Sequence, residues 1–275
     1  MKGLNTIMSQ NHEPEFLPAE EKNEKGKGVR KGYIWGVIAN SLKLAHFIYE
    51  NGSRSAEVFN RYLDKSYKGA VPTDGLACYK ELQTDAYPHA IRIACWQHCK
   101  RKFLDSDEPD AQRMVELINQ LYHIEHQLKD TTWDDQRKLQ FRVQQANPLI
   151  GKIEKLANRI MQDTQVLPKS PLSDAVGYLQ KELPALKNYL LDIRYYPDTN
   201  LIERYNRYIS LGRRNSLFCG SHQGAKRMAL LYSLTCSCRL HNINTFDYFT
   251  DILNRLAVIP PNATQETFRA LLPGK

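Results

Sequence analysis

The spacing of apolar residues changes once along this chain, near Arg101, and no other feature constrains the fold as strongly. Before that point, short runs rich in aromatic and β-branched residues, such as GYIWGVIA, LKLAHFIYE and HAIRIACW, alternate with helical spacings. Asn40 and Ser41 separate the first two runs, which predicts a hairpin. The order of strand, strand, helix, strand, helix, strand predicts an α/β fold with a sheet of mixed direction.

After Arg101 the strand-like runs stop, and apolar residues recur at helical spacing. One stripe runs from Val115 to Leu128 and another from Leu139 to Ile160, so we interpret this stretch as a helical insertion. Pro197 and Asp198 open a further helix, and a pair of helices follows before the tail. We predict five divisions. They are a degenerate or truncated N-terminal segment (1–31), a sheet region (32–105), the helical insertion (106–190), basic C-terminal helices (191–258) and a tail (259–275).

Composition limits the partners that such a chain can have. With 42% hydrophobic and 25% charged residues it can bury a core, and its net charge of +8 favours an anionic partner. No apolar run reaches the length of a membrane span, and the N-terminus lacks the apolar stretch of a signal peptide. We therefore expect a cytoplasmic protein with no membrane partner, whose six cysteines are reduced thiols.

Charge of one sign dominates a long stretch near the C-terminus. From Arg204 to Phe246 there is no Asp or Glu, whereas a solvated helical face normally mixes both signs. Guanidinium groups with glycine-rich connections between helices suit contacts to phosphates, although a merely basic surface is the alternative. The residues predicted to bind nucleic acid are Arg204, Arg207, Arg213, Arg214, Asn215, Lys226 and Arg227.

Two carboxylates are candidates for chemistry, each on a weak local signal. Asp74 ends a predicted strand, where α/β folds bind ligands, but Asp74 with Gly75 is also an ordinary turn. Glu203 lies near the start of a predicted helix, on one face with Asn200 and Arg207. The alternative for Glu203 is a solvated ion pair with Arg207.

The segment CWQHCKRKF, from Cys95 to Phe103, brings two cysteines close to His98. The spacing differs from the usual zinc pairing, and no second Cys/His pair lies nearby, so packing is favoured over zinc. Trp96 and Cys95 are expected in the core of a strand.

Several blocks of this sequence resemble those of transposases of insertion-sequence family sixty-six (IS 66). They are TDGLACYKEL, CWQHCKRKF and the long block that begins DTNLIERYNRY, in the same order and at suitable separations, with KGKGVRKGYIW and LPKSPLSDAVGYL as further matches. The resemblance extends from about Lys25 to Leu256, and the long C-terminal block is highly specific.

The resemblance implies the catalytic core of a DDE transposase, with a ribonuclease-H-like mixed sheet interrupted by a helical insertion and followed by C-terminal helices. The family's second catalytic aspartate corresponds to Asp74 in TDG, and its glutamate corresponds to Glu203 in NLIER. Both would bind metal, because Mg²⁺ prefers hard oxygen ligands, and Mn²⁺ is a possible substitute. Two such ions roughly 4 Å apart would hold the attacking and leaving oxygens of a phosphodiester in line.

The family's first aspartate has no counterpart in this chain. His12 stands in its place, followed by Glu13, and Pro14 and Pro18 predict a poorly formed strand there. The cysteine-rich zinc region and the DNA-binding helices that the family carries at its N-terminus are also absent. By this comparison the chain resembles a C-terminal fragment or a decayed copy.

The leading hypothesis is therefore a bacterial DNA transposase core that cleaves and joins strands by metal-dependent phosphoryl transfer, with impaired activity. The alternative is a non-enzymatic DNA-binding remnant that retains only the basic C-terminal block. An all-helical interaction protein is disfavoured by the strand-like runs. The expected partners are DNA, at transposon ends and target, a second copy of the chain in the active state, and companion proteins of the element.

Overall fold

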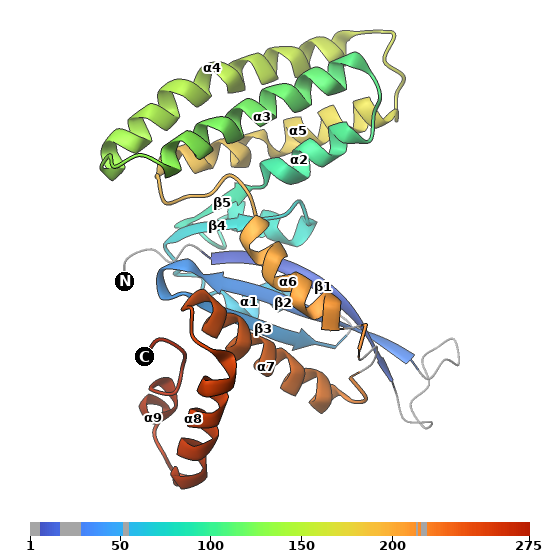
Figure 1. Ribbon diagram of the computed structural model, residues 1–275. Coiled ribbons are helices and arrows are strands. Elements are labelled where there is room, and N and C mark those ends of the chain that lie inside the picture. The colour runs from blue at the N-terminus through green and yellow to red at the C-terminus, as the bar shows by residue number, and fades with distance from the viewer. Residues whose placement is uncertain (1–5, 17–28, 52–54, 213, 216–218) are drawn as a thin grey trace. The chain divides into compact units, whose positions relative to one another are not determined.

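The computed structural model describes residues 6–16, 29–51, 55–212, 214–215 and 219–275 (Figure 1). The chain forms two compact units. The first consists of Met1–Lys65 with Leu201–Lys275, and the second of Ser66–Asn200. These limits differ from the predicted divisions, because the second unit includes strands as well as the helical insertion.

The first unit contains three antiparallel strands, β1 (Thr6–Phe16), β2 (Val29–Ala39) and β3 (Leu44–Glu50). A short 3₁₀ turn beginning at Asn40 joins β2 to β3, which confirms the predicted hairpin. The expectation of a poorly formed strand near His12 is wrong, since residues 6–16 pair with β2 over their whole length. Backbone pairing with a strongly apolar neighbour specifies this strand, whereas its own composition does not predict it.

Helices cover this sheet and supply its core. After α1 (Ala56–Tyr62), the chain returns to the unit in α6 (Asn200–Gly212) and α7 (His222–Leu240). Apolar side chains of both helices join those of β2 and β3 in one buried cluster. The helices α8 (Thr245–Val258) and α9 (Gln265–Arg269) complete the unit.

The helix α7 lies beside the edge strand β3 (Figure 1), and two of its serines bind that strand. The buried hydroxyl of Ser233 accepts a hydrogen bond from Phe47 N at 2.7 Å, and that of Ser237 accepts from Ala45 N at 2.9 Å. Their spacing of four residues places both hydroxyls on one face of the helix. The helix therefore satisfies backbone groups that an edge strand would otherwise leave unpaired.

The second unit begins with two parallel strands, β4 (Gly69–Thr73) and β5 (Ala90–Ala94), with the 3₁₀ segment η2 (Ala77–Gln83) between them. The rest of this unit is helical, as predicted, and its apolar stripes form one continuous core. Its helical elements are α2 (Trp96–Leu104), α3 (Pro109–Lys129), α4 (Asp135–Gln162), α5 (Pro171–Lys187) and the 3₁₀ turn η3 (Asn188–Leu191).

One sequence-based assignment in this unit needs correction. Cys95 and Trp96 were expected in a strand, but β5 ends at Ala94, so that Cys95 immediately precedes α2 and Trp96 is the first residue of that helix. A short apolar run does not distinguish a strand from a buried helix start. The expected burial is confirmed, since Trp96 and Cys95 are at most 1% exposed.

All six cysteines are free thiols in the structure. Within the described ranges, no helix is both long enough and apolar enough to cross a membrane.

Candidate functional site

Asp74 follows the last residue of β4 directly, at the carboxyl end of a parallel pair of strands. Its carboxylate oxygen Oδ1 accepts a hydrogen bond from Leu76 N at 3.0 Å, which fixes the turn. The next residue, Gly75, lies against Tyr178 of α5, so that an added Cβ would clash with the tyrosine hydroxyl. The turn that carries Asp74 is thus held by its own hydrogen bond and by close packing with α5.

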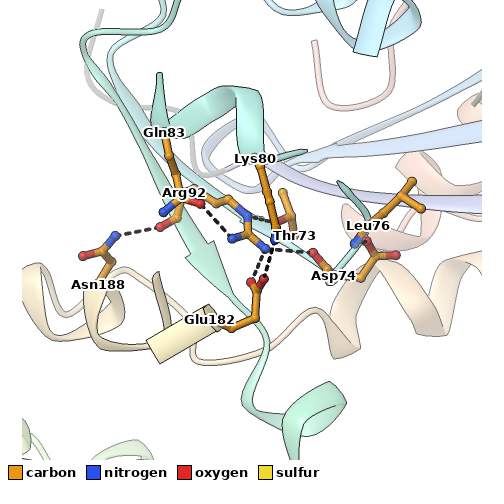
Figure 2. Close-up of polar contacts among 8 residues, drawn as sticks. All are labelled: Thr73, Asp74, Leu76, Lys80, Gln83, Arg92, Glu182 and Asn188. Atoms are coloured by element: carbon orange, nitrogen blue, oxygen red, sulfur yellow. Dashed lines mark hydrogen bonds and ion pairs between the residues drawn. The ribbon is translucent and has the colours of Figure 1, made fainter. Parts of the chain in front are cut away.

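A buried arginine binds the same end of β4 through its guanidinium group (Figure 2). Arg92, on β5, donates from Nε to Thr73 Oγ1 at 3.0 Å and from Nη2 to the backbone oxygen of Asp74 at 3.2 Å. It also donates from Nη1 to Gln83 Oε1 at 3.0 Å. A fourth hydrogen bond, from Nη2 to Glu182 Oε2 of α5, is only 2.5 Å long.

The Arg92–Glu182 ion pair is isolated from solvent, since both side chains are at most 2% exposed. A pair at this depth needs nearly all its hydrogen-bonding capacity satisfied, and the guanidinium group achieves this with the four partners above. The pair joins α5 to the strand end that carries Asp74, although Glu182 lies more than a hundred residues after Asp74 in the chain. The insertion therefore supports the candidate aspartate through α5.

Neither residue of this pair was predicted from the sequence. The available signal for Arg92 was a charged residue inside the apolar run HAIRIAC, whereas Glu182 follows Gln180 and Lys181 and carries no such signal. A charge at a core position usually has a buried partner, but the sequence does not identify that partner.

Glu203 occupies the first turn of α6 and is half-buried. Asp198, two residues before the helix, accepts hydrogen bonds from the backbone and side-chain nitrogens of Asn200, at 3.0 and 2.8 Å, in an Asx turn that leads into α6. Ile202 and Asn206, on the neighbouring faces, are buried. Arg207 is exposed and forms no ion pair within the part of the chain that the structure describes, so the solvated Glu203–Arg207 pair is not present.

The CWQHC segment anchors the chain that leads into α6. Trp96 N donates to the backbone oxygen of Pro197 at 2.9 Å, and Thr199 Oγ1 donates to Cys95 Sγ at 3.4 Å. Burial raises the pKa values of Cys95 and Cys99, which favours neutral thiols in a packing role. These contacts support the packing interpretation of this segment.

Six of the seven cationic or amide residues predicted to contact nucleic acid are exposed in the first unit, and Arg213 lies outside the described residues. These six residues lie on α6, in the turn after it, and in the first turns of α7: Arg204, Arg207, Arg214, Asn215, Lys226 and Arg227. None of them forms an ion pair with a described residue. This surface is free to meet an anion.

A cavity of about 450 Å³ adjoins this surface in the first unit. Lys226 and His222 of α7 line it, together with Arg61 and Glu50, which form an ion pair at 2.7 Å. Burial and a hydrogen bond to Glu50 raise the pKa of Tyr62, another lining residue, to about 12. The tyrosine is thus a neutral hydrogen-bond donor near neutral pH.

Asp74 and Glu203 belong to different units, so their convergence on one metal site remains a prediction. His12 lies within β1, where its backbone is opposite Tyr33 of β2.

Comparisons with known proteins identify a family and several relatives of this sequence. The model of the family described as Transposase IS66 family matches residues 17–227. Three curated proteins of Sinorhizobium fredii, each named only as an uncharacterized protein, are also similar. They are y4jD, y4qI and y4hP, with 28%, 25% and 25% identity over 80%, 82% and 83% of this chain.

The chain spans less than half the length of these curated relatives, at 43%, 44% and 45% of each. The family match, in contrast, covers most of this chain and includes Asp74, the Arg92–Glu182 pair and Glu203. The chain belongs to the IS66 family of transposases.

Proposed function

We propose that this chain is a DNA transposase core that cleaves and joins strands by metal-dependent phosphoryl transfer. The observation that carries the proposal is Asp74, fixed at the carboxyl end of β4 by its own turn and by the Arg92 hydrogen bonds. A carboxylate that must hold a metal needs such a rigid support. Family membership supplies the reaction class, and Asp74 and Glu203 are its proposed catalytic residues.

We also propose a ribonuclease-H-like arrangement for the sheet. This fold requires a particular order of elements along the chain. That order is three antiparallel strands, then a helix, then a parallel pair of strands, and β1 to β3, α1, β4 and β5 follow it. The helices α3 to α5 would then be the insertion between the strand that presents Asp74 and the helix that presents Glu203.

The proposed metal is Mg²⁺, with Mn²⁺ as a substitute, and the donors fit such an ion because carboxylate oxygens are its preferred ligands. Asp74 and Glu203 would hold it. When bound, the metal would supply charge stabilisation for the phosphodiester and lower the pKa of a water molecule. The hydrogen bond from Leu76 N fixes the Asp74 carboxylate in its turn, and the first turn of α6 carries Glu203.

DNA is the proposed partner, both at the transposon ends and at the target. Because both ends of the transposon must be cut, we propose that the active state is a homo-oligomer. Companion proteins of the element are further proposed partners. We place the reaction in the bacterial cytoplasm, where the DNA is.

The second candidate function is a DNA-binding remnant without catalysis, and the observation that favours it is His12 in β1 at the apparent place of the first aspartate. The discriminating experiment is a strand-cleavage assay on DNA that carries the ends of the element, with the chain and with a His12→Asp variant. Cleavage by the variant supports the transposase core. Binding without cleavage by either protein supports the remnant.

Neutralising Arg213 and Arg214 is expected to weaken DNA binding and reduce its salt dependence. Each lost phosphate contact should lower the slope of log affinity against log salt by about one. Fluorescence anisotropy of a labelled duplex at several salt concentrations measures this slope for the Arg213→Gln/Arg214→Gln variant. An unchanged slope would place the interface elsewhere.

A further inference from the structure

We propose that the groove between α3 and α4 is a second binding site for the phosphate backbone of duplex DNA. The inference rests on the proposed function only in taking DNA as the partner. The groove has a volume of about 350 Å³ and lies wholly within the second unit, and none of its lining residues belongs to α6 or α7. Its lining consists of four cations and two leucines: Arg113, Lys152, Lys155, Arg159, Leu117 and Leu156.

Among the residues that the structure describes, four cations line this groove and no carboxylate does. Arg159 is paired, through Nη2, with Asp110 Oδ1 at 2.5 Å. Arg113, Lys152 and Lys155 form no ion pair with any residue that the structure describes. Cations that converge on one groove repel one another, and a bound anion removes that repulsion.

The nearby acidic residues do not neutralise the site. Glu154 of α4 is paired with Lys187 of α5, and Asp110 with Arg159. Glu116 of α3 is exposed and does not line the groove. The groove therefore retains a net positive charge.

The spacing of the cations on α4 matches an extended anion better than a small one. Lys152, Lys155 and Arg159 recur at i, i+3 and i+7, which places them on one face and spreads them over about 10 Å of helix. Duplex DNA carries one negative charge per roughly 1.7 Å of axis, so a row of this length meets several phosphates. Leu117 and Leu156 offer no hydrogen bonds to base edges, which predicts binding independent of sequence.

The helices that carry these cations are rigidly held. On α4, Ile153 and Ala157 are buried in the core of the second unit, and on α3 so are Met114 and Ile118. The lysine and arginine stems thus project from fixed backbones, which reduces the entropy lost when an anion is bound.

The test is the affinity of the full chain for a fluorescein-labelled duplex of random sequence, roughly 30 base pairs long, at several salt concentrations. The test variant is Lys152→Gln/Lys155→Gln. The matched control is Lys129→Gln/Lys181→Gln, which removes the same charge from two exposed lysines of the same unit outside the groove. We expect the test variant to lose about 0.9 from the slope of log affinity against log salt per lost contact, and so nearly 2 in all, while the control stays near the parent.

A second measurement locates the contact directly. Lysine acylation followed by mass spectrometry should show Lys152 and Lys155 protected when the duplex is bound, with Lys129 and Lys181 unprotected. Equal slopes for the test and control variants, or no protection of Lys152 and Lys155, would overturn the proposal.

The outcomes also separate this proposal from the proposed function. If Arg213→Gln/Arg214→Gln weakens binding while Lys152→Gln/Lys155→Gln does not, the groove proposal is wrong and DNA remains the partner. If the unchanged chain binds no duplex at all, both proposals are wrong.

Discussion

Replacing His12 by aspartate is expected to raise the rate of strand cleavage in Mg²⁺ at least about 100-fold. A neutral imidazole brings no negative charge and suits softer metals than Mg²⁺, whereas a carboxylate is a preferred ligand. Loss of one stabilising group at a catalytic centre typically costs roughly 10²- to 10³-fold in rate, and a lost metal ligand should cost at least that much. The assay follows cleavage at the element's own ends, first with Mg²⁺ and then with Mn²⁺.

His12→Asn is the matched control, because it is similar in size to aspartate and lacks the charge, and it should show no gain. Glu13 is the rival ligand. In a strand, neighbouring side chains alternate between faces, so a carboxylate one position along is not equivalent. Robust cleavage by the unmodified chain, abolished by Glu13→Gln, would refute the role assigned to His12 and identify Glu13 as the third ligand.

Breaking the Arg92–Glu182 pair is expected to have the largest effect on stability. Arg92→Met leaves Glu182, at a site that is 2% exposed, with only the half-exposed ammonium group of Lys80 at 3.9 Å as a compensating charge. This should lower the free energy of unfolding by about 3–5 kcal/mol. Urea unfolding followed by circular dichroism measures the loss. The double variant Arg92→Met/Glu182→Leu should be less destabilised than Arg92→Met alone, because it removes both charges.

Glu154→Gln provides the control, since it removes one carboxylate from the partly exposed Lys187–Glu154 pair of the same insertion. Its cost should be within about 1 kcal/mol. If Arg92→Met costs no more than this control, the network does not hold the end of β4, and the support proposed for Asp74 fails.

The sequence predicted the hairpin, the helical stretch after Arg101 and the residues that carry the family resemblance. Those features depend on local spacing and on blocks of residues, which a single sequence contains in full. Trp96 shows the limit of prediction from local spacing, because its apolar neighbours are compatible with either a strand or a buried helix start.

Contacts between distant residues were not predictable in the same way. Arg92 and Glu182 are separated by 90 residues, and only the folded chain brings them together. The strand β1 was missed for a related reason, because its pairing with β2 outweighs the prolines and polar residues that argued against it. Asp74 and Glu203 were each ambiguous locally, and the family blocks around them made them candidates.

The shared metal site of Asp74 and Glu203 is tested most directly by Mn²⁺ binding, measured by electron paramagnetic resonance on the full chain. The variants are Asp74→Asn, Glu203→Gln and the two combined. Two ligands of one site should each account for most of the affinity, so the combined variant should bind hardly less Mn²⁺ than either single variant. Losses that simply add in the combined variant, or Mn²⁺ binding unaffected by either substitution, would contradict a common site.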